Sequence, residues 1–372
     1  FAREGAKIFA VDLNPAAAEE TRSIIEGEVR RRRSAPLAFL GLRLAVLGAF
    51  LGLDPFDLEL DGGECVALTG PSGAAEEIDS IVLFDAVAPT SRPPGLDGRV
   101  DTVTGDVADR NTVSALIDRD DISVFHLASV VSAGGERDFD LALRVNLDGT
   151  RTVLQACRAR AGAPRVVFTS SVAAFGGGAM PPTVTDTTKQ TPQTTYGMTK
   201  SIGELLLNDY TRKGFLDGRA ARPPAVIIRP GRPNAAASSY ASGIFREPLN
   251  GEECVLPVAP ETLVHVLGQR NCVEGLIVLH EADGAALGDD RAVNLPGATY
   301  AVNEMIEALR RVAAANGRAP GPVTVRPDPA IESIIAGWPT SAEADRALAL
   351  GCPADESLDR VIQDYIDDFL GR

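Results

Sequence analysis

Short apolar segments alternate along the chain with longer segments in which apolar residues recur every three or four positions. The apolar segments are "SIVLFDAV" (80–87), "SVFHLAS" (123–129), "RVVFTSS" (165–171) and "AVIIRPG" (225–231). Because they lack polar alternation, they are typical of strands that are covered on both faces, as in a parallel sheet. The intervening segments 111–119, 139–160 and 196–214 are predicted to be helices. This alternation predicts an α/β fold with a Rossmann-like doubly wound parallel sheet.

After residue 231 the alternation ends and shorter helices are expected. Their predicted ranges are about 303–315, 329–337, 341–349 and 357–369. The region is too small for a second sheet domain, so we predict a cap over the carboxyl ends of the strands, with one helix or strand returning to the sheet. The predicted organisation is an atypical N-terminal extension (1–63), a Rossmann-like domain (64–235) and a substrate-binding cap (236–372).

The segment before the first of these strands differs from the rest. Residues 56–74 are predicted to form a strand that leads into a glycine turn containing Gly70 and Gly73. Only four residues separate Gly73 from Ile78, where the next strand is approached, whereas a parallel crossover needs about ten or more. The first strand–helix unit of the sheet is therefore expected to be atypical.

Composition narrows the classes of partner. The net charge of -15 argues against nonspecific nucleic-acid binding, which needs a basic surface. Five scattered cysteines without a CxxC pair, and three distant histidines, indicate reduced thiols in a cytoplasmic protein without a metal site. Arginines at 30–33 before the apolar run 36–53 resemble a membrane anchor, but Arg43 lies in the middle of the run. A buried or poorly folded segment is therefore expected there, without a membrane partner.

A tyrosine and a lysine lie four residues apart in "TPQTTYGMTK" (191–200), in a chain with few lysines. On a helix these positions share a face, so Tyr196 and Lys200 are expected side by side. A tyrosinate can accept the proton of an alcohol that is being oxidised, and a nearby cation lowers the phenol pKa from about 10. Such a pair also occurs by chance in ordinary helices. Ser171, which lies 25 residues upstream at the end of a predicted strand, supplies a hydroxyl for the substrate oxygen and favours catalysis.

The segments "VFHLAS", "RVNLDGTRTVLQA", "VVFTSSVAAFG", "TPQTTYGMTK" and "VIIRPGRPN" together resemble the extended short-chain dehydrogenase/reductases, the NAD-dependent epimerase/dehydratase group. The resemblance runs from about Ile78 to the C-terminus. It implies that Tyr196 is the general base, that Lys200 is its electrostatic partner and binds the nicotinamide ribose, and that Ser171 binds the reacting hydroxyl. Asn146 would hold the active-site helix and a proton-relay water, or would have a purely structural role between helix and backbone.

The same resemblance implies that the cofactor is NAD. Asp85, at the end of its strand, would bind the adenosine ribose and disfavour a 2′-phosphate, although an acid there is also an ordinary turn or helix cap. Asp106 would contact adenine, and His126 is expected to be a packed strand-end residue. The other expected cofactor contacts are Val107, Leu127, Ala128, Ser129, Asn146, Tyr196 and Lys200, with Gly70 and Gly73 at the pyrophosphate.

The phosphate loop is the weak part of this pattern. A Rossmann loop needs a strand, a glycine turn and a helix N-terminus, but Glu76 occupies the third glycine position and would repel phosphate. Residues 56–74 resemble the start of an ABC-transporter ATPase without the P-loop lysine, and residues 1–28 resemble part of a different short-chain dehydrogenase. We therefore hypothesise a chimeric N-terminal part, with junctions near 29–36 and 74–78, and weakened NAD binding.

Three further segments, "TPQTTYG", "RPGRPNAAASSYASGIFREPLNGEE" and "PDPAIESIIAGWP", resemble those members of the group that oxidise a small sugar acid. The carboxylate of such a substrate requires a cation, ideally a bidentate arginine. The expected substrate contacts are Ser171, Tyr196, Arg229, Arg232, Asn234 and Ser238, with Arg246 and Arg270 as further candidate arginines. Each arginine is also compatible with a surface or structural ion pair.

The predicted function is thus NAD-dependent oxidation of a secondary hydroxyl of a small sugar acid, by Tyr/Lys-assisted proton abstraction and hydride transfer. Two alternatives stay open. A nucleotide-sugar epimerase or dehydratase would return the hydride to its intermediate, and a Rossmann-like binding module would have no catalytic activity. The expected partners are the small-molecule substrate and a second copy of the chain in a homodimer.

Overall fold

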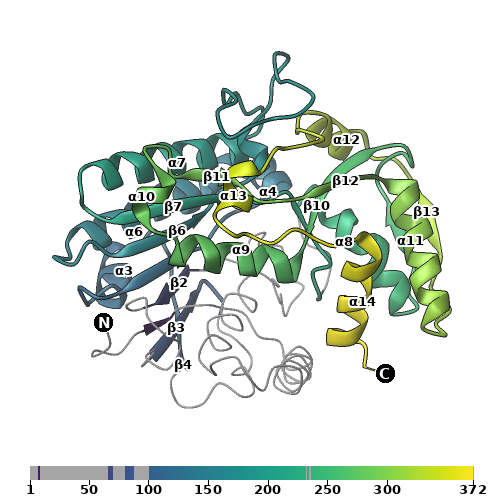
Figure 1. Cartoon of the computed structure of the whole chain (residues 1–372), viewed down its shortest axis with the longest axis horizontal. Coiled ribbons are helices and arrows are strands. Elements are labelled where there is room, and N and C mark those ends of the chain that lie inside the picture. Colours follow the sequence, from purple (N-terminus) through teal and green to yellow (C-terminus); the bar gives the residue numbers. More distant parts are fainter. Residues whose placement is uncertain are drawn as a thin grey trace.

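The computed structural model describes residues 7–8, 66–69, 80–87, 100–231, 233 and 236–371 (Figure 1). The strands of its main sheet are β1 (Lys7–Ile8), β2 (Val66–Thr69), β3 (Ser80–Asp85), β4 (Val100–Thr104), β5 (Ser123–His126), β6 (Arg165–Thr169), β7 (Asp217–Arg222) and β11 (Ala292–Asn294). Their order is β1-β3-β2-β5-β6-β7-β11, and β4 also pairs with β3. Every pair that does not involve β2 is parallel, which confirms the predicted Rossmann-like sheet.

β2 runs antiparallel to both of its neighbours. Val66 pairs with Phe84 near the end of β3, and Thr69 pairs with Ser123 at the start of β5. Ten residues separate β2 from β3, which is at the lower limit for a parallel crossover, and the reversed direction agrees with this short connection. The chain leaves β2 at the edge opposite to the carboxyl ends of the parallel strands. Gly70 and Gly73 lie outside the described residues.

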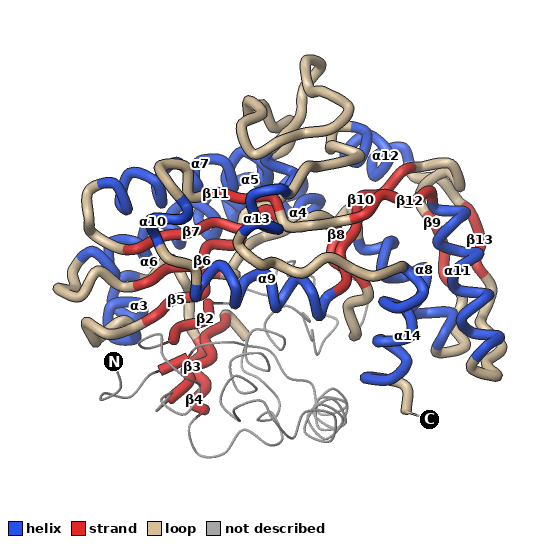
Figure 2. Tube along the Cα trace, viewed as in Figure 1, coloured by secondary structure: helices blue, strands red, loops and turns tan. Residues whose placement is uncertain are grey.

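Helices cover both faces of the sheet (Figure 2). One face carries α3 (Arg110–Leu116), α6 (Thr150–Arg158) and α7 (Thr195–Arg212), and the other carries α9 (Gln269–Glu281). Val124 and Phe168 enter the first apolar core, whereas Phe125 and Val167 enter the second. Successive residues of β5 and β6 are therefore buried on opposite sides, which explains why these strands lack polar alternation.

The predicted helix 139–160 is divided. It begins as α5 (Phe139–Ala142), widens into a π-helical segment, η2 (Leu143–Gly149), and continues as α6. A Cβ on Gly149 would lie 2.5 Å from Cγ1 of Val107, so the absence of a side chain lets the helix approach the loop after β4. Such π-helical turns are often found beside functional sites.

The region after β7 forms a cap with two small sheets, on the right in Figure 1. One has the order β12 (Ala298–Ala301), β10 (Leu263–Gly268), β8 (Ala225–Ile227), and the other pairs β13 (Val323–Val325) with β9 (Cys254–Leu256). Its helices are α8 (Ser239–Leu249), α11 (Val302–Ala315), α12 (Pro329–Ala336) and α14 (Leu358–Phe369). Two short helices after β7 lie against the main sheet instead: α10 (Gly284–Leu287) contacts β7, and α13 (Asp345–Ala349) contacts β11. β11 returns to the main sheet, where it pairs with β7.

The assignment of residues 225–231 to the main sheet was wrong. β8 covers only the start of this segment and pairs with β10 in the cap. The position next to β6 is taken by β7, whose sequence "DGRAAR" contains a fully buried Arg219. Arg219 bonds to Asp217 Oδ2 at 3.0 Å and to the Ala282 carbonyl oxygen at 3.0 Å, so paired charges replace the apolar pattern that the prediction required.

Within the described part of the chain, no helix has the length and apolar character needed to cross a bilayer. The apolar run 36–53 lies outside that part. The same described residues contain no group of three or more histidine, cysteine, aspartate or glutamate side chains arranged to hold a metal ion.

Candidate active site

The start of α7 packs tightly against the short 3-10 turn η3 (Val172–Ala174) that follows β6, and this contact brings Tyr196 next to Ser171. The Thr194 hydroxyl caps the helix by accepting a hydrogen bond from the Gly197 N–H at 3.1 Å. A Cβ on Gly197 would lie only 2.1 Å from the Ala173 carbonyl oxygen, so glycine is required for the approach. Ser171 Oγ accepts a hydrogen bond from the Ala173 N–H at 3.1 Å, which fixes the hydroxyl at the strand end.

Tyr196 borders a cavity but is otherwise enclosed by protein. Burial raises the pKa of its phenol, because the tyrosinate loses hydration. A hydrogen bond with Ser171 and the positive charge of Arg229 act against this effect of burial and lower the phenol pKa. Nζ of Lys200 lies 5.4 Å from the centre of the Tyr196 ring. Arg229, which the sequence assigned only to substrate binding, is thus a second cation near the phenol.

Lys200 is 3% exposed, and its ammonium group is held from the strand side. Nζ donates a hydrogen bond to the Thr169 carbonyl oxygen at 2.7 Å and lies 5.0 Å from the centre of the Phe168 ring. Burial lowers the pKa of Lys200 to about 7, and the negative charge of Glu204 opposes this shift. The charge of Lys200 at neutral pH therefore depends on Glu204.

Glu204, one helical turn after Lys200, belongs to a buried ion pair. Arg222 donates to both carboxylate oxygens, from Nε at 2.8 Å and from Nη2 at 2.7 Å. The Ser170 hydroxyl and the Gln190 amide donate to the same carboxylate. Because every oxygen of the carboxylate has partners from other segments, this pair fixes α7 against β6 and β7.

The side chain of Asn146 makes all of its hydrogen bonds within the protein. Oδ1 accepts from the Val130 N–H at 2.7 Å, and Nδ2 donates to the Val130 carbonyl oxygen at 3.0 Å and to Thr199 Oγ1 at 3.1 Å. Asn146 is 3% exposed and does not line the cavity. These contacts favour the structural alternative, in which Asn146 ties the segment after β5 to α7.

The residues predicted for the adenosine end lie after β3, β4 and β5. Asp85 ends β3, is buried, and accepts a hydrogen bond from the Val87 N–H at 3.1 Å. Asp106 forms an ion pair with Arg144, with Nη1 2.6 Å from Oδ2. Two further predicted contacts are buried in the apolar core: Val107 and Ala128. The roles of these residues in cofactor binding stay predictions.

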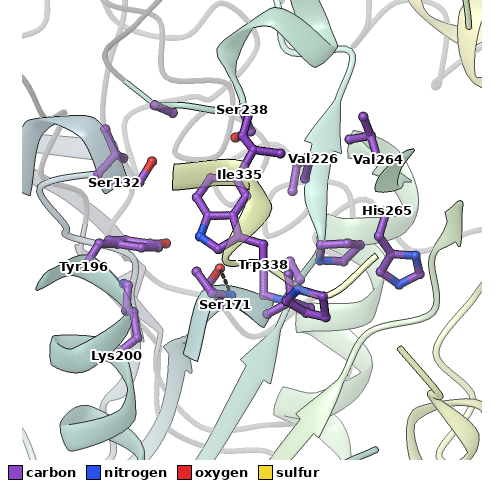
Figure 3. A pocket seen from close by; sticks show the side chains of 18 of the residues that line it. Ser132, Ser171, Tyr196, Lys200, Val226, Ser238, Val264, His265, Ile335 and Trp338 are labelled. Atoms are coloured by element: carbon purple, nitrogen blue, oxygen red, sulfur yellow. Dashed lines mark hydrogen bonds between the residues drawn. The ribbon is translucent and has the colours of Figure 1, made fainter. Parts of the chain in front are cut away.

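A cavity of about 220 Å³ lies beside Tyr196, between the sheet and the cap (Figure 3). The predicted site residues that line it are Leu127, Ser129, Ser171, Tyr196, Lys200, Arg229 and Ser238. The predicted residues that are described but do not line it are Asp85, Asp106, Val107, Ala128 and Asn146. Arg232 and Asn234 lie outside the described residues. The structure therefore brings the proposed proton-transfer group and one candidate arginine into a single cavity.

Two of the other candidate arginines have structural partners instead. Arg246 donates to the Arg229 carbonyl oxygen at 3.0 Å and pairs with Glu247 at 2.6 Å. Arg270 pairs with Asp364 at 2.7 Å and with Asp368, both in α14. Neither arginine lines the cavity. Burial lowers the pKa of Arg229 to about 10, so its guanidinium is still a cation at neutral pH.

The sequence did not identify the residues that the cap contributes. Tyr240 of α8, His265 of β10 and Trp338 after α12 all line the cavity. They lie far apart along the chain, and only the folding of the cap over the sheet brings them to Tyr196. Burial lowers the pKa of His265 to about 4, which makes this ring neutral at physiological pH. The one available signal was Trp338, the sole tryptophan of the chain.

Known proteins are similar to this chain in sequence and in fold. Residues 75–282 match the NAD dependent epimerase/dehydratase family. The chain belongs to this family. D-erythronate dehydrogenase of Cupriavidus necator is 48% identical over 331 residues, which cover 89% of this chain and 95% of the relative. D-erythronate dehydrogenase of Haemophilus influenzae is 38% identical over 291 residues, which cover 78% and 90%. The solved nucleoside-diphosphate-sugar epimerase from Agrobacterium tumefaciens is 40% identical, with a TM-score of 0.72 and coverage of 80% and 87%.

Membership of the NAD dependent epimerase/dehydratase family confirms the predicted class, an oxidoreductase of the NAD-dependent type, and implies use of NAD(H). The match to the Cupriavidus enzyme is longer than the segment from Ile78 to the C-terminus, so the similarity extends upstream of Ile78. This extent gives no support to the hypothesis of a chimeric N-terminal part with a junction near 74–78.

Proposed function

We propose that this protein oxidises the C2 hydroxyl of D-erythronate, or of a closely related small sugar acid, with NAD. The observation that carries the proposal is that Ser171, Tyr196 and Arg229 line one cavity. A 2-hydroxy acid presents complementary groups, because its carboxylate is bonded to the carbon that loses the hydride and suits a guanidinium. The 48% identity to the Cupriavidus D-erythronate dehydrogenase supports this substrate.

In this proposal Tyr196 is the general base. Its phenolate accepts the hydroxyl proton while the hydride leaves, and Ser171 holds the reacting oxygen. Arg229 has two effects, since it binds the carboxylate and its charge lowers the pKa of Tyr196. Lys200 is fixed by the Thr169 carbonyl oxygen at 2.7 Å and supplies positive charge from the other side of the site.

NAD, when bound, supplies the hydride acceptor. The described residues fit its nicotinamide end, because the cavity extends from Lys200 to Leu127 and Ser129 after β5. We propose that Lys200 binds the nicotinamide ribose and that Asp85 and Asp106 bind the adenosine. The position of Asp85 at a strand end supports a preference for NAD over NADP, because its carboxylate would repel a 2′-phosphate.

The test is NADH formation from D-erythronate. One NADH should appear for each substrate molecule that is oxidised, and Tyr196→Phe should lower kcat by about 100-fold or more, as expected for loss of a general base. Tyr210→Phe is the matched control, because Tyr210 lies on the same helix but bonds to Gln155 outside the cavity. Absence of NADH with D-erythronate and other C4–C6 aldonates would contradict the proposal.

A nucleotide-sugar epimerase is the second candidate, because the solved Agrobacterium relative has that name. Such an enzyme would use the same Tyr196 but return the hydride, so NADH would not accumulate. The cavity of about 220 Å³ is below the roughly 300–1,000 Å³ that is typical of drug-sized ligands, which favours a four-carbon acid. A binding module without catalysis would be indicated by inactivity of both the wild type and Tyr196→Phe.

We also propose that residues 64–235 form the NAD-binding domain and 236–372 the substrate-binding cap. A cytoplasmic location is supported by free buried thiols at Cys157, Cys254, Cys272 and Cys352. The net charge of -15 supports a small-molecule substrate without a nucleic-acid partner. Sedimentation of the purified chain would test the proposed homodimer.

A further inference from the structure

We propose that the indole N–H of Trp338 binds the substrate by donating a hydrogen bond to the carboxylate next to the reacting carbon. This inference rests on the proposed function above. Trp338 follows α12, and its side chain lines the same cavity as Tyr196 and Ser171. In Figure 3 the indole extends from the cap toward these two residues, and its nitrogen lies on the side that faces the Tyr196 hydroxyl.

Nε1 of Trp338 is buried and has no hydrogen-bond partner in the described part of the chain. An indole nitrogen can only donate, and a buried donor without an acceptor is unfavourable and uncommon in native proteins. An oxygen of a bound ligand would satisfy it. In the proposed reaction Tyr196 and Ser171 bind the reacting oxygen. The indole N–H would therefore donate to a different substrate oxygen, on the adjacent carbon.

The backbone that carries Trp338 is held on both sides. Its own N–H donates to the Ile335 carbonyl oxygen at 2.9 Å. Two residues further on, the Thr340 carbonyl oxygen accepts from the Thr299 hydroxyl at 2.6 Å. A Cβ on Gly176 would lie 3.1 Å from the Gly337 carbonyl oxygen, so the preceding residue packs closely on the loop after β6. The donor is therefore pre-organised, which reduces the entropy lost when the substrate binds.

The charge in the cavity agrees with an anionic oxygen at this position. Arg229 lines the same cavity and is a cation at neutral pH. A carboxylate has two oxygens with about four acceptor sites, so it can accept from a guanidinium and from an indole at the same time. Trp338 would thus select substrates in which the carboxylate is adjacent to the carbon that is oxidised.

Trp338→Phe tests the donor, because it keeps an aromatic ring but removes the N–H. With D-erythronate, kcat/KM should fall by about tenfold to a hundredfold, as for loss of a hydrogen bond to a charged group, and mainly through KM. The matched control is Tyr300→Phe, which removes a polar group from β12 in the cap but not from the cavity lining. Its kcat/KM should be unchanged.

Fluorescence gives a second measurement that needs no substitution at Trp338. Because Trp338 is the sole tryptophan, the intrinsic emission reports on this indole alone. In Tyr196→Phe, which keeps the indole but not the base, D-erythronate added with NAD should change the emission. Erythritol, a four-carbon polyol without a carboxylate, should not change it.

The two proposals fail in different ways. A fluorescence change with D-erythronate, but no NADH from the wild type, would contradict the proposed reaction and support the role of Trp338. If the wild type forms NADH but D-erythronate leaves the fluorescence of Tyr196→Phe unchanged, the role of Trp338 is contradicted. A second outcome would also contradict this role: kcat of Trp338→Phe falls at constant KM, and the acid limb of its kcat/KM profile against pH moves to higher pH. The indole would then act on Tyr196 and not on the substrate.

Discussion

Two cations lie near the Tyr196 phenol, and they differ in how they are held. Lys200 is fixed by a backbone carbonyl oxygen and lies 5.4 Å from the ring centre, whereas Arg229 lines the cavity. The charge of Arg229 and the hydrogen bond with Ser171 are what lower the pKa of the phenol against the effect of burial. The pH at which the base becomes active should therefore depend on Arg229.

Arg229→Met should move the acid limb of the kcat/KM profile to higher pH by about one unit, because the tyrosinate loses a nearby opposite charge. KM for D-erythronate should rise as well, since the carboxylate loses its cation. In Arg229→Lys the acid limb should lie close to its wild-type pH, because the positive charge is kept. Ser238→Ala, an uncharged change in the same cavity, should leave the pH of the acid limb unchanged. An unchanged limb in Arg229→Met would show that this charge does not tune Tyr196.

Lys200 should lower the stability of the protein without cofactor. Its folded pKa of about 7 lies below the unfolded value of about 10.4, so the unfolded state binds more protons between these pH values. The free energy of unfolding should thus rise as the pH rises from about 7 to about 10. Lys200→Met lacks this titration and should be more stable at pH 7. The gain is up to about 4 kcal/mol, reduced by the contribution of the hydrogen bond that the variant loses.

Urea unfolding between pH 6 and pH 10, about the range of the titration, measures this difference. The difference in the free energy of unfolding between Lys200→Met and the wild type should be largest below pH 7 and should decrease as the pH approaches 10. Lys213→Met is the control, because Lys213 is exposed at the C-cap of the same helix. A difference that does not change with pH would contradict a depressed pKa for Lys200.

The residues of the proposed site differ in how far the sequence could place them. The sequence placed Tyr196, Lys200 and Ser171 together, and they do line one cavity, because one helical turn and one strand end determine where their side chains lie. Trp338 was not found, because its contact with the site depends on how the cap folds over the sheet. Helical periodicity places residues within an element but does not determine which element faces another.

At the scale of elements, Gly197 determines how closely α7 approaches the 3-10 turn η3 (Val172–Ala174) that follows β6. Alanine normally stabilises a helix by about 1 kcal/mol relative to glycine, but here its Cβ would lie 2.1 Å from the Ala173 carbonyl oxygen. Gly197→Ala should therefore destabilise the protein by about 1–3 kcal/mol and move Tyr196 away from Ser171, which lowers kcat by about tenfold or more. Gly178→Ala is the control, because nothing lies within 4 Å of its Cβ.

Thermal unfolding and kcat should be measured on both glycine variants. A Gly197→Ala protein with wild-type kcat would mean that the helix start can shift without disturbing the base.

Apolar runs predicted β3, β5 and β6 well, because strands buried on two faces need apolar residues at successive positions. The same rule failed for β7. Its buried Arg219 is compensated by Asp217 and a backbone carbonyl oxygen, and such partners cannot be read from the strand itself. The apolar "AVIIRPG" was assigned to the main sheet in its place, although β8 pairs with β10 in the cap.

For the whole molecule, the direction of β2 matters most for the cofactor. The carboxyl ends of the parallel strands meet at one edge of the sheet, where the residues proposed for the nicotinamide end lie. β2 points the other way, which agrees with its short connection of ten residues to β3. Connection length, which is visible in the sequence, therefore indicated the atypical first unit, whereas Gly70 and Gly73 lie outside the described residues.

This architecture predicts weak binding of NAD. Since Thr69 ends β2 at the start of β5, the described part of β2 does not lead to the edge where we propose the nicotinamide end. Loss of two hydrogen bonds to the pyrophosphate, at about 1.5–3 kcal/mol each for charged groups, would weaken binding by more than about 100-fold. Calorimetry should therefore give a Kd for NAD that is weaker than micromolar.

The comparison protein is this chain with its first unit replaced by a parallel strand, a glycine turn and a helix of the Rossmann type. It should bind NAD at least about tenfold more tightly, because a parallel first strand followed by a helix would direct N–H groups at the pyrophosphate. Nicotinamide mononucleotide, which lacks the adenosine and the pyrophosphate bridge, separates the two halves of the site, and both proteins should bind it equally. A micromolar Kd for NAD in the unchanged chain would mean that other residues supply the phosphate contacts and that the direction of β2 does not limit cofactor binding.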